Sequence, residues 1–396
     1  MLILPDDVIT DILSRLPVKP LLRFRCVCKP WLDLIDSPVF IKLHLNKTKK
    51  LESHRTLIQQ GSAPDIYTVD FDSITKTNIA EVISVPDPFG PVGVVNCCNG
   101  LVCVSIPNGS GIAIWNPSTR RHQILPDFDC FPLPTRSKGC RSFCGFEYDV
   151  LGDDYKVLVI KQTDSVLQKS FSSEVSVYSL KENSWKQIKP FPYYLKYERS
   201  PGVAACGAIH CIVGKTKWCS KQLIAAFDLA TEEYRIVPQP KYPSKMDFYL
   251  YLETLGGCLS LMWGYRIDYI DVWVLKEYGK QDSWTKITRI NASTFSGNSF
   301  GFMRTIAYSV SEKELIMEKG MNSMVRYDIE KKSAKNVEIR GERTNPIYSH
   351  IYQESLVQLK NGGPTVSQKQ VAHHSKKIEK PKKRDKFLSH GFKLVL

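Results

Sequence analysis

The chain has 396 residues, 43% of them hydrophobic, enough for a large folded domain with or without a smaller one. Its start, MLILPDDVITDIL, has no basic leader, and no run approaches the roughly 18 apolar residues of a membrane span, so we expect neither a signal peptide nor a transmembrane helix. Nine of its basic residues lie within 364–396, so the rest is only mildly basic despite a net charge of +14, which disfavours a nucleic-acid-binding protein.

Three short helices are predicted in the first forty-five residues. Ile9, Ile12, Leu13 and Leu16 recur at helical spacing, and prolines stand at both ends of this segment. LLRFRCVC predicts a second helix, and PWLDLIDS a third that opens with proline. A unit this small cannot bury all its apolar side chains alone, since below about 40 residues a chain usually needs a staple or a partner. The helices therefore either bind a partner helix or cap the domain that follows.

The stretch RFRCVCKPWLDLI places Cys26 and Cys28 one residue apart. The twelve cysteines of the chain form no zinc-binding spacing and, without a secretory signal, are typical of reduced thiols in a nuclear or cytosolic protein. We therefore interpret Cys26 and Cys28 as small packing residues at a helix junction.

The segment LPDDVITDILSRLPVKPLLRFRCVCKPWLDLIDSPVFIKLHL resembles an F-box over some forty positions without a gap. That resemblance implies docking to a SKP-type adaptor, and through it to a cullin and a RING subunit. By position, it also implies a set of adaptor-facing or box-core residues: Leu4, Pro5, Ile9, Ile12, Leu13, Leu16, Pro17, Leu21, Val27 and Trp31. We expect a few large residues to dominate adaptor affinity, with Leu13 and Trp31 as candidates.

Beyond residue 50 the pattern changes to short alternating strands separated by turn residues, which predicts an all-β region. Five segments share an aromatic residue, a polar turn and a later apolar residue. The aromatic residues are Trp115, Tyr178, Phe227, Trp273 and Tyr327, and Phe71 marks a weaker sixth copy. Their spacing of about 50 residues is typical of propeller blades, and six units would fit residues 51–363. A β-sandwich with coincidental turn similarity is the alternative.

Several of these segments, from CNGLVCVS and WNPSTRRHQILP onwards, resemble the F-box-associated domain of plant F-box proteins. The predicted fold class is therefore an α+β multidomain protein, a small N-terminal helical F-box followed by an all-β propeller-like domain. We assign residues 1–45 to the box, 51–363 to the propeller-like domain and 364–396 to a basic C-terminal tail.

No catalytic or metal motif has its required context. Gly297-Asn298-Ser299-Phe300-Gly301 has the spacing of a hydrolase nucleophile elbow but lies in a polar loop rather than between a strand and a helix. Gly214-Lys215-Thr216 ends like a phosphate loop, yet Ile209 occupies the position of the required first glycine. We therefore expect a non-catalytic subunit without metal or cofactor.

Two segments rich in aromatic residues, PFPYYLKY and DFYLYLE, are candidate substrate contacts because tyrosine provides large contact area at little entropic cost. The candidates are Tyr193, Tyr194, Tyr197, Tyr249 and Tyr251. The alternative interpretation, that these rings are blade-core residues, is favoured.

The two resemblances together imply a substrate-recognition subunit of an SCF-type ubiquitin ligase. The ending RDKFLSHGFKLVL also resembles that of a plant F-box protein that regulates immunity, which implies intracellular immune receptors as substrates. Lys380 to Lys386 could serve as a nuclear import signal, so we expect the protein in cytoplasm and nucleus. A non-degradative adaptor-bound scaffold and a propeller that acts as an enzyme or binds glycans are the alternatives.

Overall fold

The computed structural model describes residues 4–51, 55–60, 66–86, 88–90, 92–106, 111–128, 140–165, 170–197, 199–241, 248–265, 268–295, 303–309, 311–320, 323–341 and 348–359. They belong to the first of the two units into which the chain divides, Met1–Lys360. The second unit, Asn361–Leu396, lies outside the described residues, and so do the predicted basic tail 364–396 and the Gly297–Gly301 motif. No helix in the described ranges is long and apolar enough to cross a membrane.

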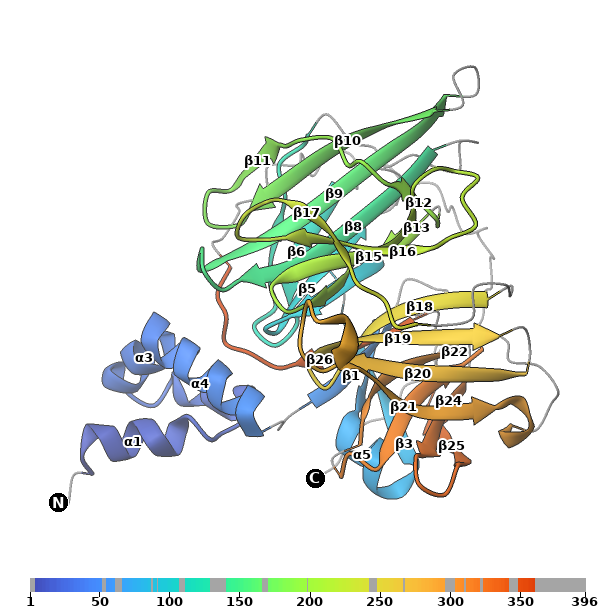
Figure 1. The fold of residues 1–396 in the computed structure, drawn as a ribbon. Helices are drawn as coiled ribbons and strands as arrows, with labels where there is room; N and C mark the ends of the chain where they lie inside the picture. The colour runs from blue at the N-terminus through green and yellow to red at the C-terminus, as the bar shows by residue number, and fades with distance from the viewer. Residues whose placement is uncertain are drawn as a thin grey trace, which may run out of the picture. The chain divides into compact units, whose positions relative to one another are not determined.

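The N-terminal helical box consists of α1 (Asp6–Leu13), α2 (Val18–Phe24), α3 (Lys29–Asp36) and α4 (Pro38–Leu51) (Figure 1). The first three helices lie where the sequence predicts them. Pro5 and Pro17 precede α1 and α2, a position that tolerates proline because the first N–H groups of a helix have no intrahelical partner. The box core combines the inner faces of all four helices: Leu13, Val18, Leu21, Ile35 and Phe40, joined by Leu356 from the far end of the described chain.

The fourth helix was missing from the sequence prediction, which ended the box at residue 45. Ser37 caps it, since the Ser37 hydroxyl accepts a hydrogen bond from the Phe40 N–H at 3.1 Å. Pro38 then occupies the first helical position, where its fixed φ suits a helix. His44 on this helix is buried and its Nε2 lies 2.9 Å from the Leu16 carbonyl oxygen, which ties α4 to the turn between α1 and α2.

The strands of the described chain form six four-stranded antiparallel blades (Figure 1). From the innermost strand outwards, blade 1 contains β26 (Tyr348–Gln353), β1 (Arg55–Gln60), β2 (Ile66–Asp70) and β3 (Ile79–Val85); blade 2 contains β4 (Gly93–Cys98), β5 (Leu101–Ile106), β6 (Gly111–Asn116) and β7 (Arg121–Ile124); blade 3 contains β8 (Cys140–Asp149), β9 (Asp154–Ser165), β10 (Ser170–Ser179) and β11 (Ser184–Gln187). Blade 4 contains β14 (Val203–Ala205), β15 (Ala208–Gly214), β16 (Leu223–Asp228) and β17 (Tyr234–Val237); blade 5 contains β18 (Phe248–Leu255), β19 (Cys258–Tyr265), β20 (Tyr269–Leu275) and β21 (Trp284–Asn291); blade 6 contains β22 (Met303–Tyr308), β23 (Glu314–Lys319), β24 (Ser323–Asp328) and β25 (Ser333–Arg340).

Short elements link these blades. A two-residue strand, β12 (Tyr194–Leu195), pairs with the end of β15, and β13 (Arg199–Pro201) pairs in parallel with β8. Parallel pairing of β25 with β3 joins blades 6 and 1 into one 8-stranded sheet. The remaining elements are α5 (Phe71–Thr77) and the 3-10 turns η2 (Gln281–Ser283) and η3 (Ala292–Thr294).

The six innermost strands form a closed ring. Each contacts the next in the order β26, β4, β8, β14, β18 and β22, and β22 contacts β26 again. Blade 1 closes the ring, because its innermost strand comes from the end of the described chain and pairs antiparallel with β1. Radial closure leaves few exposed strand edges. The predicted propeller is thus confirmed, and the β-sandwich alternative is wrong.

The repeated aromatic residue lies on the third strand of blades 2 to 6. Trp115, Tyr178, Phe227 and Tyr327 are buried there, whereas Trp273 on β20 is half-buried. In blades 2, 3, 4 and 6 the next residue then shapes the turn to the fourth strand, as its side chain accepts hydrogen bonds from the turn backbone, whereas blade 5 has Val274 at this position. Three such bonds are Asn116 Oδ1 from Ser118 N (3.0 Å), Asp228 Oδ1 from Ala230 N (3.1 Å) and Asp328 Oδ1 from Glu330 N (3.1 Å). In those four blades the repeat is therefore a buried ring followed by a turn-capping side chain.

Phe71, the weaker sixth copy, is an exception to this pattern. It is buried, but it begins α5 directly after the third strand of blade 1. The Asp70 side chain caps this helix by accepting a hydrogen bond from Ser73 N at 3.0 Å. The Asp and Ser that read as a turn in the sequence thus start a helix.

Candidate functional site

Helix α1 carries two apolar faces, and the box buries only one of them. Ile9 and Leu13 pack into the box core, whereas Leu4 just before the helix, and Val8 and Ile12 on it, are 54%, 38% and 47% exposed. These three residues are spaced by four and lie along one side of the segment. The helix therefore presents an apolar stripe that its own fold leaves uncovered.

Three more large apolar residues of the box are exposed: Val27 after α2, with Val39 and Leu43 on α4, are 61%, 79% and 42% exposed. We call these residues with Leu4, Val8 and Ile12 the box surface. Val8, Val39 and Leu43 were not among the predicted site residues, although Val8 continues the spacing of Leu4 and Ile12.

The structure divides the ten predicted adaptor-facing or box-core residues into three groups. Exposed are Leu4, Pro5, Ile12 and Val27; half-buried are Ile9, Leu16, Pro17 and Trp31; buried are Leu13 and Leu21. Trp31 packs edge-on against Phe24, with ring centroids 5.5 Å apart. Leu13, predicted to dominate adaptor affinity, is only 2% exposed, so it stabilises the box and offers no surface to a partner.

The interpretation of Cys26 and Cys28 as packing residues is wrong, because both side chains are exposed. Cys28 precedes α3 in an extended conformation with φ of −160°, and this turns it out of the core. Among the described residues, no group of histidine, cysteine and acidic side chains could hold a metal ion.

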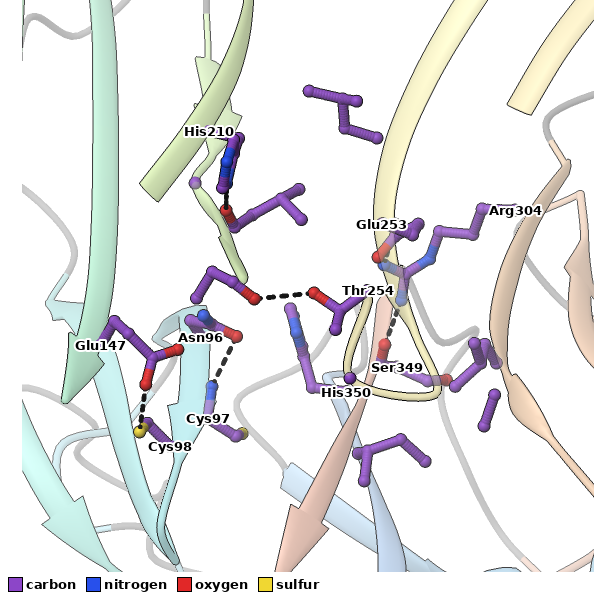
Figure 2. A pocket seen from close by; sticks show the side chains of 18 of the residues that line it. Asn96, Cys97, Cys98, Glu147, His210, Glu253, Thr254, Arg304, Ser349 and His350 are labelled. Atoms are coloured by element: carbon purple, nitrogen blue, oxygen red, sulfur yellow. Dashed lines mark hydrogen bonds and ion pairs between the residues drawn. The ribbon is translucent and has the colours of Figure 1, made fainter. Parts of the chain in front are cut away.

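A second candidate site is a cavity of about 550 Å³ in the middle of the propeller, a volume within the range of ligand pockets. Residues from the innermost strands of all six blades line it, among them Cys98 (β4), Glu147 (β8), Val203 (β14), Glu253 (β18), Arg304 (β22) and His350 (β26). Figure 2 shows these walls, with polar side chains on both sides of the space.

Arg304 is the centre of a buried ionic network in this cavity. Its guanidinium lies 2.9 Å from Glu253 and 2.6 Å from Glu318, and it also donates to the carbonyl oxygen of Ser349. Figure 2 shows Arg304 with Glu253 and Ser349. Burial raises the pKa of Glu253, an effect that Arg304 partly offsets. Because these residues come from blades 5, 6 and 1, the network links three blades at the point where the ring closes.

Two histidines of the cavity are held neutral. Burial, reinforced by the positive charge of Arg304, lowers the pKa of His350 to about 3. Burial also lowers the pKa of His210 to about 4, although a hydrogen bond from its Nδ1 to the Val203 carbonyl oxygen, 3.0 Å away, acts in the opposite direction. Neutral imidazoles at pH 7 add no charge to the cavity.

The cavity thiols are protonated and therefore poor nucleophiles. Burial raises the pKa of Cys98 far above its ordinary value, and the neighbouring Glu147 carboxylate raises it further. The Cys98 thiol donates a hydrogen bond to Glu147 at 2.9 Å (Figure 2). Burial has the same effect on the pKa of Cys97.

The predicted substrate-contacting tyrosines do not form one surface. Tyr197 and Tyr251 line the cavity, and the Tyr197 hydroxyl donates to the Leu250 carbonyl oxygen at 3.2 Å. Tyr193 is half-buried and packs on Phe191. Tyr194 is 2% exposed, which corrects its assignment as a contact residue. Tyr249 lies in β18, but its side chain is outside the described part of the structure.

Comparison with known proteins shows what the whole chain is similar to. Residues 1–43 match the F-box domain family, and residues 68–359 match the family described as F-box associated beta propeller domain. F-box protein CPR1 of Arabidopsis thaliana is 34% identical over 100% of both chains. A second F-box protein of that plant is 32% identical over 99% of both chains, and an F-box/kelch-repeat protein is 29% identical over 74% of this chain and 80% of its own.

Proposed function

The chain belongs to the F-box proteins that carry an F-box-associated β-propeller domain, and from this premise we propose that it is the substrate-recognition subunit of an SCF-type ubiquitin ligase. In this proposal the box binds a SKP-type adaptor, which connects it to a cullin and a RING subunit. The propeller holds a protein substrate near the ubiquitin-carrying enzyme. Rate enhancement then comes from proximity, so no side chain of this chain has to react.

The box surface carries this proposal. A helical unit that fills its own core and still exposes six large apolar side chains has surface to bury against a partner. Amphipathic helices of this kind commonly dock into apolar grooves or helical bundles. The exposed Asp11–Arg15 ion pair at 3.0 Å, at the C-terminal end of α1, would contribute to the polar rim of such an interface.

The proposal also names a substrate class and a location. Because the ending RDKFLSHGFKLVL resembles that of a plant F-box protein that regulates immunity, we propose intracellular immune receptors as substrates. The basic run from Lys380 to Lys386 supports activity in the nucleus as well as the cytoplasm.

The test uses exposed residues, so that loss of binding is not loss of folding. We predict that Ile12→Asp with Val27→Asp lowers recovery of the adaptor at least about 10-fold, because each change places a charge in an apolar interface. Leu151→Asp is the matched control, since Leu151 is 85% exposed on the β8–β9 turn of the propeller. The measurement is co-purification of adaptor with the full chain, beside a melting curve for each variant.

Unchanged adaptor recovery in the double variant would contradict the proposed role of the box. Substrate lifetime then separates the ligase from a non-degradative scaffold. If adaptor is lost while the half-life of a co-purifying protein stays the same, the scaffold is the better description.

A further inference from the structure

The loop between β15 and β16, residues 214–222 with the sequence GKTKWCSKQ, displays an exposed tryptophan. Trp218 is 77% exposed, more than every other described large hydrophobic residue except Leu151 and Val39. Tryptophan is usually largely buried, and at protein interfaces it is a frequent source of binding energy. The loop contains the Gly214-Lys215-Thr216 motif, for which the sequence offered no role.

Hydrogen bonds from Lys196 and close packing at Gly214 hold this loop in its conformation. The Lys196 ammonium donates to the carbonyl oxygens of Lys217, at 3.4 Å, and Cys219. A Cβ atom on Gly214 would lie 2.6 Å from Lys196 Cε and 2.9 Å from the Thr216 carbonyl oxygen, so a larger residue would not fit. Gly214 therefore serves close packing rather than phosphate binding, and Trp218 projects from an ordered loop, which reduces the entropy lost on binding.

Asp164 anchors the loop to blade 3. Its carboxylate lies 2.8 Å from Lys217 Nζ and 3.8 Å from an Arg141 nitrogen, and it accepts a hydrogen bond from the Tyr194 hydroxyl at 3.2 Å. The Arg141 guanidinium also lies 4.7 Å from the centre of the Tyr194 ring. Tyr194, predicted as a substrate contact, thus supports the loop from the core.

The surface around Trp218 is strongly basic. Lys215, Lys217 and Lys221 are exposed on the loop, and Lys196 and Arg141 lie next to it. Asp164 pairs with Arg141 and Lys217, whereas Lys215 and Lys221 have no carboxylate partner among the described residues, so the loop carries excess positive charge. Lysine ammonium groups around an exposed aromatic ring complement a ligand that is anionic and partly apolar.

We propose that this loop recognises an acidic segment of the protein substrate, rich in Asp and Glu, in which an apolar side chain packs on Trp218. The inference rests on the proposed substrate-recognition function and names the chemistry of the segment recruited. The indole ring supplies the apolar anchor, and the lysines set the preferred charge and speed the encounter.

The test measures binding of labelled 12-residue peptides to the purified full chain by fluorescence polarisation. One peptide carries Asp and Glu around a central leucine, and its partner carries Asn and Gln at the same positions. We expect the acidic peptide alone to bind, with an affinity that falls as salt is added. Trp218→Ala and the double variant Lys215→Glu, Lys221→Glu should each weaken it at least 10-fold, while Leu151→Ala should not.

Equal binding of the acidic peptide by wild type and Trp218→Ala, or no binding by wild type at low salt, overturns the proposal. Tighter binding of a single-stranded oligonucleotide of equal charge also overturns it, because the loop would then be a nucleic-acid site. Adaptor recovery is measured on the same preparations. A chain that binds the peptide but no adaptor contradicts the proposed ligase function and leaves the loop assignment standing.

Discussion

At the scale of single residues, the neutral histidines of the propeller cavity link folding to pH. His350 and His210 have folded-state pKa values of about 3 and about 4, below the ordinary value of 6.5 that an unfolded chain would show. At a pH between the folded-state pKa and 6.5, each of these histidines is protonated in the unfolded chain but not in the folded chain. Stability is therefore fully present above pH 6.5 and decreases as the pH falls towards 4.

We predict that lowering the pH from 7.5 to 5 reduces the free energy of unfolding by about 2 kcal/mol for each of these histidines, from 1.36 kcal/mol per pH unit below 6.5. His350→Gln removes one titrating group and should flatten the decline. The measurement is urea unfolding of the full chain at several pH values. His122, which is exposed, provides the control His122→Gln, and an equal slope in both variants would contradict the assignment.

The Arg304 network shows what a residue pattern cannot predict. Glu253, Glu318 and Ser349 lie 51, 14 and 45 positions from Arg304 in the chain, at no repeating interval. Each is an ordinary strand residue by its local sequence. The β22–β23 hairpin places Glu318 opposite Arg304. Glu253 and Ser349 reach Arg304 only because the ring places β18, β22 and β26 side by side.

At the scale of elements, the turns between the first and second strands of two blades distinguish backbone strain from steric collision as the cost of replacing a glycine. Gly100 and Gly207 end equivalent turns in blades 2 and 4, with φ of +77° and +73°. A Cβ on Gly207 would meet no atom within 4 Å, whereas on Gly100 it would lie 2.7 Å from the Gln353 carbonyl oxygen and collide with Ser355. A side chain would therefore strain the backbone at both glycines, but only at Gly100 would it also collide with the C-terminal segment.

We predict that Gly207→Ala costs about 1–2 kcal/mol, the price of a left-handed residue with a Cβ. Gly100→Ala should cost a further 1–3 kcal/mol, roughly the penalty of overpacking, because Gln353 contributes a rigid backbone atom. Denaturant unfolding of both variants beside wild type measures the difference. Equal destabilisation would show that the segment around Ser355 moves aside freely.

Element type was predictable where the repeat was strong. An alternating strand and an aromatic residue recur in blades 2 to 6, and a capping Asn, Ser or Asp follows the aromatic residue in blades 2, 3, 4 and 6. Prediction failed where local signals had two meanings. Asp70 caps α5 instead of a turn, and the sequence around Cys28 turns that side chain outwards. Trp218 was overlooked because a single exposed tryptophan in a lysine-rich loop belongs to no repeating sequence pattern.

At the scale of the whole molecule, one segment joins the parts of the first unit. Residues 348–359 supply β26 to blade 1, and Asn116 of blade 2 donates to the carbonyl oxygens of Ser355 (3.1 Å) and Val357 (2.8 Å). Leu356 lies in the box core. The period of about 50 residues was visible in the sequence, but this closing role was not, because β26 belongs to a repeat whose other strands lie some 290 residues earlier.

We predict that a chain ending at residue 347 fails to fold, whereas a chain ending at residue 359 melts like the full chain. The shorter chain exposes the edge of β1, leaves Asn116 without its two carbonyl partners and removes Leu356 from the box core. An open ring also loses contacts of β22 and β4 with β26, so neighbouring blades are destabilised together. Far-ultraviolet circular dichroism and thermal melting of the two truncated chains test this prediction.

A cooperative transition at the wild-type temperature for the chain ending at 347 would mean that the propeller does not depend on closure by β26. A loss of the transition in the chain ending at 359 would instead assign a stabilising role to residues 360–396.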